Sequence, residues 1–143
     1  MTDRRYPNRP ILAVGTIVVR EGRVLLARRG TPPAVGLWSV PGGGVRLGEE
    51  LRAAARREVR EETNLEIRDI EFICFQEFIH DERFWRRRHF IFFDYACRTD
   101  STEVLLNDEA QDYVWVDLDR INELPVEHYT AVAIDKYRER NSR

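Results

Sequence analysis

Residues 41–65, PGGGVRLGEELRAAARREVREETNL, join a glycine turn to a helix rich in carboxylates. The range Glu49–Thr63 has no glycine, proline or aromatic residue and is rich in Ala, Glu and Arg, so it predicts a helix. Asn64 follows directly and can take the left-handed conformation that ends a helix. The glycines of Gly42–Gly44 predict a break in regular structure before the helix. The stretch therefore predicts a turn that leads into a charged helix.

The predicted helix has two chemically different sides when it is placed on a wheel of about 100° per residue. Its inward stripe is formed by Leu51, Ala54, Ala55 and Val59, and its outward side by Arg52, Arg56 and Arg60. Glu58 and Glu62 continue the apolar stripe, and Glu61 borders it. Spacings of three and four residues place these carboxylates on one face. An ordinary surface helix would instead keep its glutamates with its arginines.

Three carboxylates that are held together and partly desolvated repel one another, and a divalent cation is the simplest group to offset that repulsion. Hard oxygen ligands favour Mg²⁺, with Mn²⁺ as a substitute. The alternative is a solvated acidic helix end that pairs with local arginines, and the inward placement of the glutamates argues against it. The glycine turn can add a carbonyl ligand for a metal or amides for a phosphate.

The rest of the chain predicts strands on either side of this helix and a helix at the end. The expected strands are Ile11–Val19, Val24–Ala27, Trp38–Val40, Glu71–Ile79, His89–Arg98 and Asp112–Val116, and the second helix is Val126–Arg140. This order predicts an α/β fold with a mixed sheet and helices on both sides. The length of 143 residues suits one compact domain over residues 1–143, with residues 1–10 as a loosely ordered lead-in.

Composition narrows the classes of partner. The formal net charge is -2, so no overall basic field favours a nucleic-acid polymer. No apolar stretch approaches the ~20 residues of a membrane span, and no signal-type apolar core follows the polar N-terminus. These features predict a cytoplasmic protein that binds neither membranes nor nucleic-acid polymers.

The run from Gly43 to Leu65 resembles the Nudix box of the MutT-like Nudix hydrolases. That box reads Gly, five residues, Glu, seven residues, Arg-Glu, an aliphatic residue, any residue, Glu-Glu, any residue, Gly and an aliphatic residue. The 23 residues agree in spacing and match eight of nine constrained positions, and Asn64 replaces the last glycine. Asparagine is the next-best residue for a left-handed cap. Segments Leu25–Arg29, Gly36–Gly43 and Tyr113–Val116 also resemble the family, so the likeness covers nearly the whole chain.

The resemblance implies an α/β/α sandwich with a mixed central sheet, and an enzyme that cleaves a nucleoside diphosphate linked to another group. By match, the metal ligands would be Glu58, Glu61, Glu62 and the carbonyl of Gly42. One of the three glutamates could also activate water, and the metal would polarise the phosphoanhydride. Arg57 would pair with Glu49 to fix the geometry of helix and loop, which completes the predicted catalytic set.

Residues outside the box carry the substrate predictions. Glu109 is the carboxylate that we expect to join the site as a metal ligand or base, and a solvated acidic loop is the equally weighted alternative. Arg28, Arg29 and Trp38 are predicted to bind substrate, although tryptophans at such positions are more often core residues. The loop Phe84–His89 would stack a base and grip phosphates, or else form a hairpin tip or a dimer contact. Six phenylalanines are interpreted as sheet residues that pack on helices: Phe72, Phe75, Phe78, Phe90, Phe92 and Phe93.

Three functions follow from these features. The first is Mg²⁺-dependent hydrolysis of a phosphoanhydride bond in a nucleoside triphosphate or a related nucleoside diphosphate derivative. The second is hydrolysis of ADP-ribose or another nucleoside diphosphate sugar. The third is a non-catalytic, nucleotide-binding regulatory domain, against which the complete set of glutamates argues. The expected partner is a small-molecule nucleotide, and a homodimer is an expectation at the level of the family. The nucleotide, the phosphorus that is attacked and the glutamate that acts as base stay open.

Overall fold

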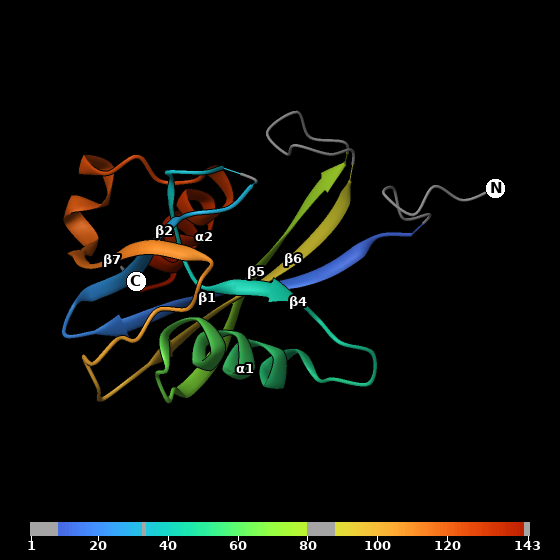
Figure 1. Ribbon diagram of the computed structural model, residues 1–143, viewed down its shortest axis with the longest axis horizontal. Coiled ribbons are helices and arrows are strands. Elements are labelled where there is room, and N and C mark those ends of the chain that lie inside the picture. The colour runs from blue at the N-terminus through green and yellow to red at the C-terminus, as the bar shows by residue number, and fades with distance from the viewer. Residues whose placement is uncertain (1–8, 33, 80–87, 142–143) are drawn as a thin grey trace.

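The computed structural model describes residues 9–32, 34–79 and 88–141. A seven-stranded sheet lies between two helices (Figure 1). Its strands are β1 (Ile11–Arg20), β2 (Arg23–Arg29), β3 (Trp38–Ser39), β4 (Gly42–Gly44), β5 (Arg68–Ile79), β6 (His89–Arg98) and β7 (Ala110–Asp117). The helices are α1 (Leu51–Thr63), the short 3-10 helix η1 (Leu118–Glu123) and α2 (His128–Asn141). Most of the predicted lead-in and of the loop Phe84–His89 lies outside the described residues.

The sheet is mixed, as the sequence predicts. Its main order is β3-β2-β1-β6-β5, with β4 paired to β1 and β7 paired to β2. The central pair β1–β6 is parallel, whereas the other pairs are antiparallel. The turn at Glu21-Gly22 joins β1 to β2 as a hairpin, in which Val19 lies opposite Val24. β1 is therefore the strand to which the glycine segment before α1 is attached.

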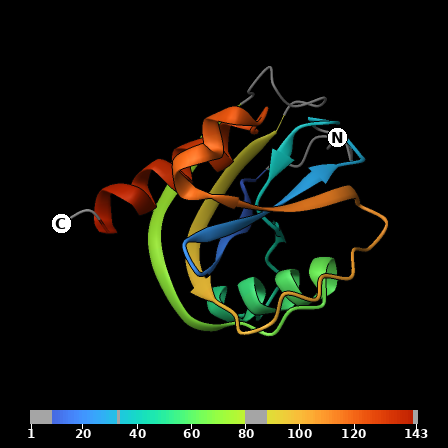
Figure 2. The ribbon, with the colours of Figure 1, turned by 90° about the vertical axis from the view of Figure 1, so that its left-hand side faces the viewer.

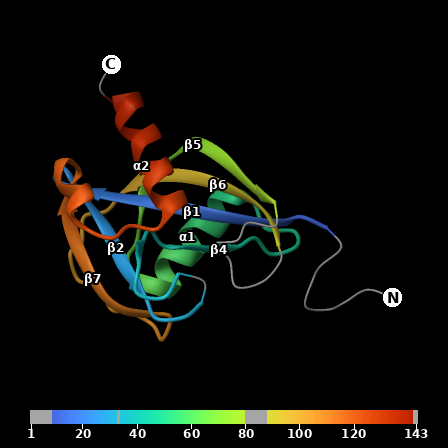
Figure 3. The ribbon, with the colours of Figure 1, turned by 90° about the horizontal axis from the view of Figure 1, so that it is seen from above.

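The two helices cover opposite faces of the sheet (Figures 2 and 3). Side chains of a strand alternate between faces, and β1 uses this alternation to build two cores. On one face, Ile17 and Val19 pack with residues of α2 that include Ile134. On the other face, Val14 packs against Ala54 and its neighbour in α1. The apolar pattern of β1 thus holds both helices to one sheet.

Two boundaries differ from the sequence prediction at the glycine segment. The helix begins at Leu51, two residues later than expected, because Glu50 is extended and the side chain of Glu49 accepts a hydrogen bond from the Arg46 amide at 3.0 Å. Gly42–Gly44 forms a short strand rather than an irregular turn, because it pairs with β1 from Ala13 to Gly15. This pairing fixes the glycine backbone in front of α1.

Two of the phenylalanine predictions are wrong. Phe78 and Phe92 are buried, but Phe75 is 65% exposed and Phe72 is 39% exposed. Both exposed rings lie on β5, which ends the main order of the sheet and has a neighbouring strand on one side only. Within the described residues, no helix is both long enough and apolar enough to cross a membrane.

Candidate active site

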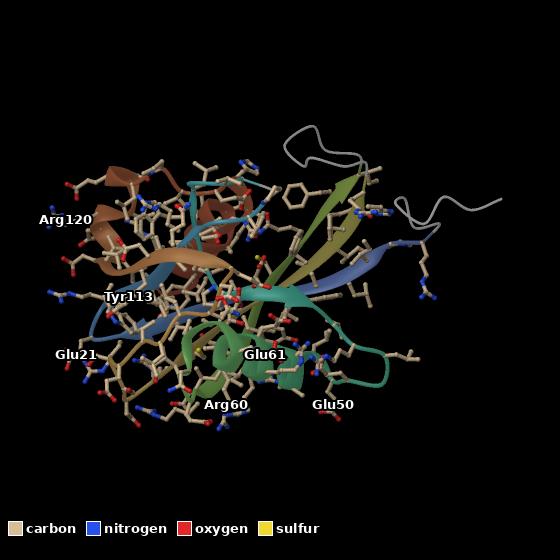
Figure 4. The ribbon with its side chains drawn as sticks, in the orientation of Figure 1. Glu21, Glu50, Arg60, Glu61, Tyr113 and Arg120 are labelled. Carbon is tan, nitrogen blue, oxygen red and sulfur yellow. The ribbon has the colours of Figure 1, made fainter. Side chains whose placement is uncertain are left out.

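Helix α1 turns Glu58 and Glu62 toward the protein, whereas Arg52, Arg56 and Arg60 are exposed to water. Ala54, Ala55 and Val59 are completely buried, whereas Arg60 is exposed. In Figure 4, Arg60 of α1 and Glu50, which precedes the helix, lie on the side of α1 away from the sheet. The helix ends at Asn64, whose φ of 66° and ψ of 13° are left-handed, as predicted. The prediction that α1 has one buried apolar side and one exposed side is therefore confirmed.

Glu62 is the most deeply desolvated carboxylate of the helix. One of its oxygens accepts a hydrogen bond from the backbone N–H of Gly42 at 2.8 Å. Its pKa is raised well above the ordinary value, first by burial and then by the negative charges of Glu58 and Glu109. Glu62 also lines a small cavity together with Arg29 and Glu109. The loop before β7 thus brings Glu109 to the helix, although the two lie far apart in the sequence.

Glu58 lies one helical turn before Glu62 and packs against the glycine strand. A Cβ atom on Gly43 would come within 2.6 Å of the Glu58 carboxyl group, so a larger residue there would force that carboxyl group to shift. Burial raises the pKa of Glu58, and the guanidinium of Arg57 opposes that rise. Two carboxylates with raised pKa values are therefore held beside one backbone segment.

Arg57 links the glycine strand to the helix. Its guanidinium donates two hydrogen bonds to Glu49, at 2.7 and 2.9 Å, in a bidentate pair. It also donates to Glu58 at 2.7 Å and to the carbonyl of Gly44 at 2.9 Å. The bidentate pair with Arg57, and then the hydrogen bond from the Arg46 amide, lower the pKa of Glu49 to about 2, since they stabilise its ionised form. Arg57 and Glu49 therefore hold the site together and stay charged.

Glu61 is half exposed and lies between two arginines. It accepts from Arg57 at 3.3 Å and from Arg46 at 3.4 Å. In the part of the chain that the structure describes, no three His, Cys, Asp or Glu side chains are placed to hold an ion together. The reason is local, because Arg57 holds Glu58 and Glu61 while the Gly42 amide holds Glu62. The donor set of carboxylates nevertheless suits a hard divalent cation.

Gly42 can contribute its carbonyl from the same side of the strand. The N–H and C=O of one strand residue point to the same side, and alternate residues point to opposite sides. Because the Gly42 N–H donates to Glu62, its carbonyl also faces away from β1. The structure thus directs a backbone oxygen of the glycine strand toward the carboxylate helix.

A second cavity, which we call the aromatic pocket, is lined in part by the glycine strand. It measures about 180 Å³, and its walls include Gly15, Arg29, Val40, Phe90, Phe92 and Tyr129. The rings of Phe92 and Tyr129 are stacked with centroids 4.7 Å apart. Arg29 lines both this pocket and the cavity of Glu62. The two cavities therefore share the cation of Arg29 and the side of Val40.

The other two predicted substrate residues lie beside these cavities without lining either one. The guanidinium of Arg28 lies over the ring of Trp38, 5.8 Å from its centroid. Trp38 is partly buried and packs against the core between the sheet and α2. Its role in substrate binding, like that of Arg28, stays a prediction.

Asp94 is a residue of this region that the sequence reasoning missed. It is 1% exposed and lies on β6 opposite Gly15. Burial raises its pKa to about 6, although hydrogen bonds from Gln76 and Cys74 oppose the rise. A single aspartate in the apolar run FIFFDYAC of residues 90–97 is the signal that could have marked it.

Replacing Asp94 with asparagine is expected to stabilise the fold above pH 6. The pKa of Asp94 rises from 3.8 to about 6 on folding, so the folded protein binds the proton more tightly. The free energy of unfolding therefore falls as the pH rises between these values. The variant should gain about 1–3 kcal/mol at pH 8 and much less at pH 4. Urea unfolding followed by circular dichroism measures both, and equal gains at the two pH values would contradict the argument.

Comparison with known proteins shows which proteins this chain is similar to. The NUDIX domain model matches residues 9–137. The nucleoside triphosphatase NudI of Salmonella agona strain SL483 is 34% identical over 110 residues, which cover 70% of this chain and 77% of that protein. The protein of the same name from Escherichia coli strain K12/DH10B has the same identity and coverage.

Solved structures of similar proteins share the fold. The MutT NUDIX hydrolase from Burkholderia pseudomallei has a TM-score of 0.81 and 28% identity, and the match covers 90% of this chain and 98% of that one. The NUDIX domain of Shewanella oneidensis NrtR, solved in complex with ADP ribose, has a TM-score of 0.79. Its identity is 23%, with 93% of this chain and 89% of that chain covered, so it shows the fold alone.

Proposed function

Because this chain belongs to the Nudix family of hydrolases, we propose that it hydrolyses a phosphoanhydride bond of a nucleoside triphosphate in a Mg²⁺-dependent reaction. Its mixed sheet between two helices is the fold of that family. The proposal depends most on one observation, the burial of Glu62 next to Glu58 and Glu109. Carboxylates in that position repel one another unless protons or a cation neutralise them.

The residues that would hold Mg²⁺ are Glu58, Glu61, Glu62, Glu109 and the carbonyl of Gly42. Bound there, Mg²⁺ (or Mn²⁺) would polarise the phosphoanhydride and lower the pKa of a water. Burial raises the pKa values of Glu58 and Glu62, which makes each carboxylate a better acceptor for a proton from water.

The remaining residues of the site position the substrate. Arg57 and Glu49 fix the glycine strand against α1, so that the carboxylates and the Gly42 carbonyl stay aligned. Arg29 lies between the two cavities and offers a cation to phosphate oxygens. The aromatic pocket would receive the nucleobase, since stacked rings favour a flat aromatic ligand. A nucleotide would then lie across the glycine strand, with its phosphates toward Glu62.

A panel of nucleotides tests this function. The four common nucleoside triphosphates, ITP and ADP-ribose are incubated with Mg²⁺ or with EDTA, and the phosphate, pyrophosphate and monophosphate released are measured. We expect turnover of at least one triphosphate with Mg²⁺ and none with EDTA. Turnover of ADP-ribose alone would move the activity to nucleoside diphosphate sugars. Tight nucleotide binding without any turnover would make the protein a binding domain.

Mg²⁺ binding is expected to weaken as the pH falls. Protons compete with the ion for Glu58 and Glu62, whose pKa values are raised when no metal is bound. The apparent Kd for Mg²⁺ should therefore increase as the pH falls through the raised pKa values of these carboxylates, by up to about tenfold per pH unit for each one that becomes protonated. Calorimetric titration at pH 6, 7 and 8 measures the effect. A Kd that does not change with pH would show that these two glutamates do not bind the ion.

A further inference from the structure

We propose that Asp94, which lies behind Gly15 in the wall of the aromatic pocket, reads the nucleobase and selects bases that present an amino group. The inference rests on the proposed function in one respect, because it assumes that this pocket receives the base. Asp94 then acts as a specificity residue and takes no part in the cleavage of the phosphoanhydride.

The position of one carboxylate oxygen is the first observation. Oδ1 of Asp94 is buried, and it has no hydrogen-bond partner among the residues that the structure describes. It lies 2.8 Å from the point where a Cβ atom on Gly15 would be. Gly15 itself lines the aromatic pocket, so a larger residue there would cover the oxygen. Because Gly15 has no side chain, no side-chain atom of this residue stands between Oδ1 and the pocket.

The other carboxylate oxygen is held in place. Oδ2 of Asp94 accepts a hydrogen bond from Nε2 of Gln76 at 2.8 Å and a weaker one from Sγ of Cys74 at 3.5 Å. Gln76 also donates to the backbone carbonyl of Tyr129 at 2.9 Å. Tyr129 is one of the stacked rings of the pocket. The orientation of the carboxylate is thereby tied to the wall that the base would contact.

The pocket has the size and lining of a base site. Its volume of about 180 Å³ is below the roughly 300–1,000 Å³ of pockets for drug-sized ligands, so it suits a flat ring rather than a whole nucleotide. Phe90 and Phe92 are stacked with centroids 5.3 Å apart, which extends the aromatic wall. In such an apolar enclosure, a buried acceptor without a partner costs free energy, and a ligand that donates to it recovers that cost.

The chemistry of Oδ1 determines which bases are favoured. An ionised carboxylate only accepts hydrogen bonds, so it pairs with the exocyclic amino group of cytosine or adenine. The oxo group at the same position of uracil or hypoxanthine is itself an acceptor and would face Oδ1 unfavourably. A site built to bind an N–H discriminates strongly against analogues that lack it, because its own polar group is then left without a partner.

Matched pairs of substrates test the wild-type protein without any substitution. CTP and UTP differ in this amino or oxo group, and so do ATP and ITP. In the pair that is turned over faster, kcat/KM for the amino member should be at least about tenfold higher. Equal values for both members of each pair would overturn the inference.

The variant Asp94→Asn provides the second test. Gln76 would keep its acceptor by bonding the amide oxygen, and the amide nitrogen would then take the place of Oδ1 as a donor. The ratio of kcat/KM between amino and oxo substrates should fall by about tenfold or more, while Mg²⁺ dependence is unchanged. Asp119→Asn is the matched control, because Asp119 is an exposed carboxylate of η1. An unchanged ratio in the folded Asp94→Asn variant would contradict the proposal.

Nucleoside binding separates this inference from the proposed function. Saturation-transfer NMR with cytidine against uridine, and adenosine against inosine, needs neither a phosphate nor turnover. Preferential binding of the amino nucleosides that is lost in Asp94→Asn would support base selection by Asp94 even if no triphosphate is cleaved. Triphosphate cleavage with no preference in either assay would support the proposed hydrolase function and reject base selection by Asp94.

Discussion

The variant Glu62→Gln is expected to lose Mg²⁺-dependent hydrolysis by at least a factor of about one hundred while its fold is kept. Substitution of groups that only support metal ligands typically costs about 10–100-fold, so loss of a ligand should cost more. The glutamine side chain can still accept the hydrogen bond from the Gly42 amide, which is 2.8 Å long in the native protein. It also removes a buried charge whose pKa is raised by burial, Glu58 and Glu109, so the free energy of unfolding should not decrease.

Glu50→Gln is the matched control for this variant. Glu50 precedes α1, is exposed, and extends away from the sheet in Figure 4. The same change of charge at that position should leave kcat within about twofold of the native value, since a surface charge contributes little. Steady-state kinetics with Mg²⁺, together with thermal unfolding of both variants, completes the comparison. Native activity in folded Glu62→Gln would remove this residue from the site.

The second large effect is expected for Arg57→Ala, which should lower both stability and activity. The guanidinium supplies the bidentate pair with Glu49 and also bonds Glu58 and the carbonyl of Gly44. Without it, the half-buried Glu58 has no cation beside it, and the fold should lose about 2 kcal/mol. The glycine strand should also lose its alignment with α1, which lowers kcat/KM by about 10–100-fold.

Two further variants sharpen this prediction. Arg57→Lys keeps the charge but cannot form the bidentate pair, so it should recover little of the lost activity. Arg60→Ala removes an arginine from the exposed side of the same helix, where it pairs with the exposed Glu66, and should change stability by less than about 1 kcal/mol. Urea unfolding and kinetics of all three variants provide the data. If Arg57→Ala behaved like Arg60→Ala, the geometry of the site would not depend on Arg57.

Much of α1 could be predicted from the sequence because its signals are local. The alternation of alanines, glutamates and arginines defines its buried side, and Asn64 ends it in the left-handed conformation. The start of the helix was less predictable. Glu49 has a good helix propensity, but its side chain is engaged by Arg57 and the Arg46 amide, and these contacts keep it outside the helix.

The parts that escaped prediction depend on contacts between distant segments. The strand at Gly42–Gly44 forms only because β1 lies beside it, and glycine propensity alone predicts a turn. Asp94 becomes a candidate for a ligand-binding residue only when the pairing of β1 with β6 places it opposite Gly15. Neither the parallel pairing of those strands nor the hydrogen bond from Gln76 has a local signature in the sequence.

Binding of Mn²⁺ tests the central claim, that the glutamates of α1 hold a catalytic cation, more directly than any rate. Free Mn²⁺ is followed by electron paramagnetic resonance during titration of the native protein, Glu62→Gln and Glu50→Gln. We predict that the native protein and Glu50→Gln each bind at least one ion, which Mg²⁺ displaces, and that Glu62→Gln binds at least about tenfold more weakly. Equal binding by all three proteins, or no binding by the native protein, would contradict the account.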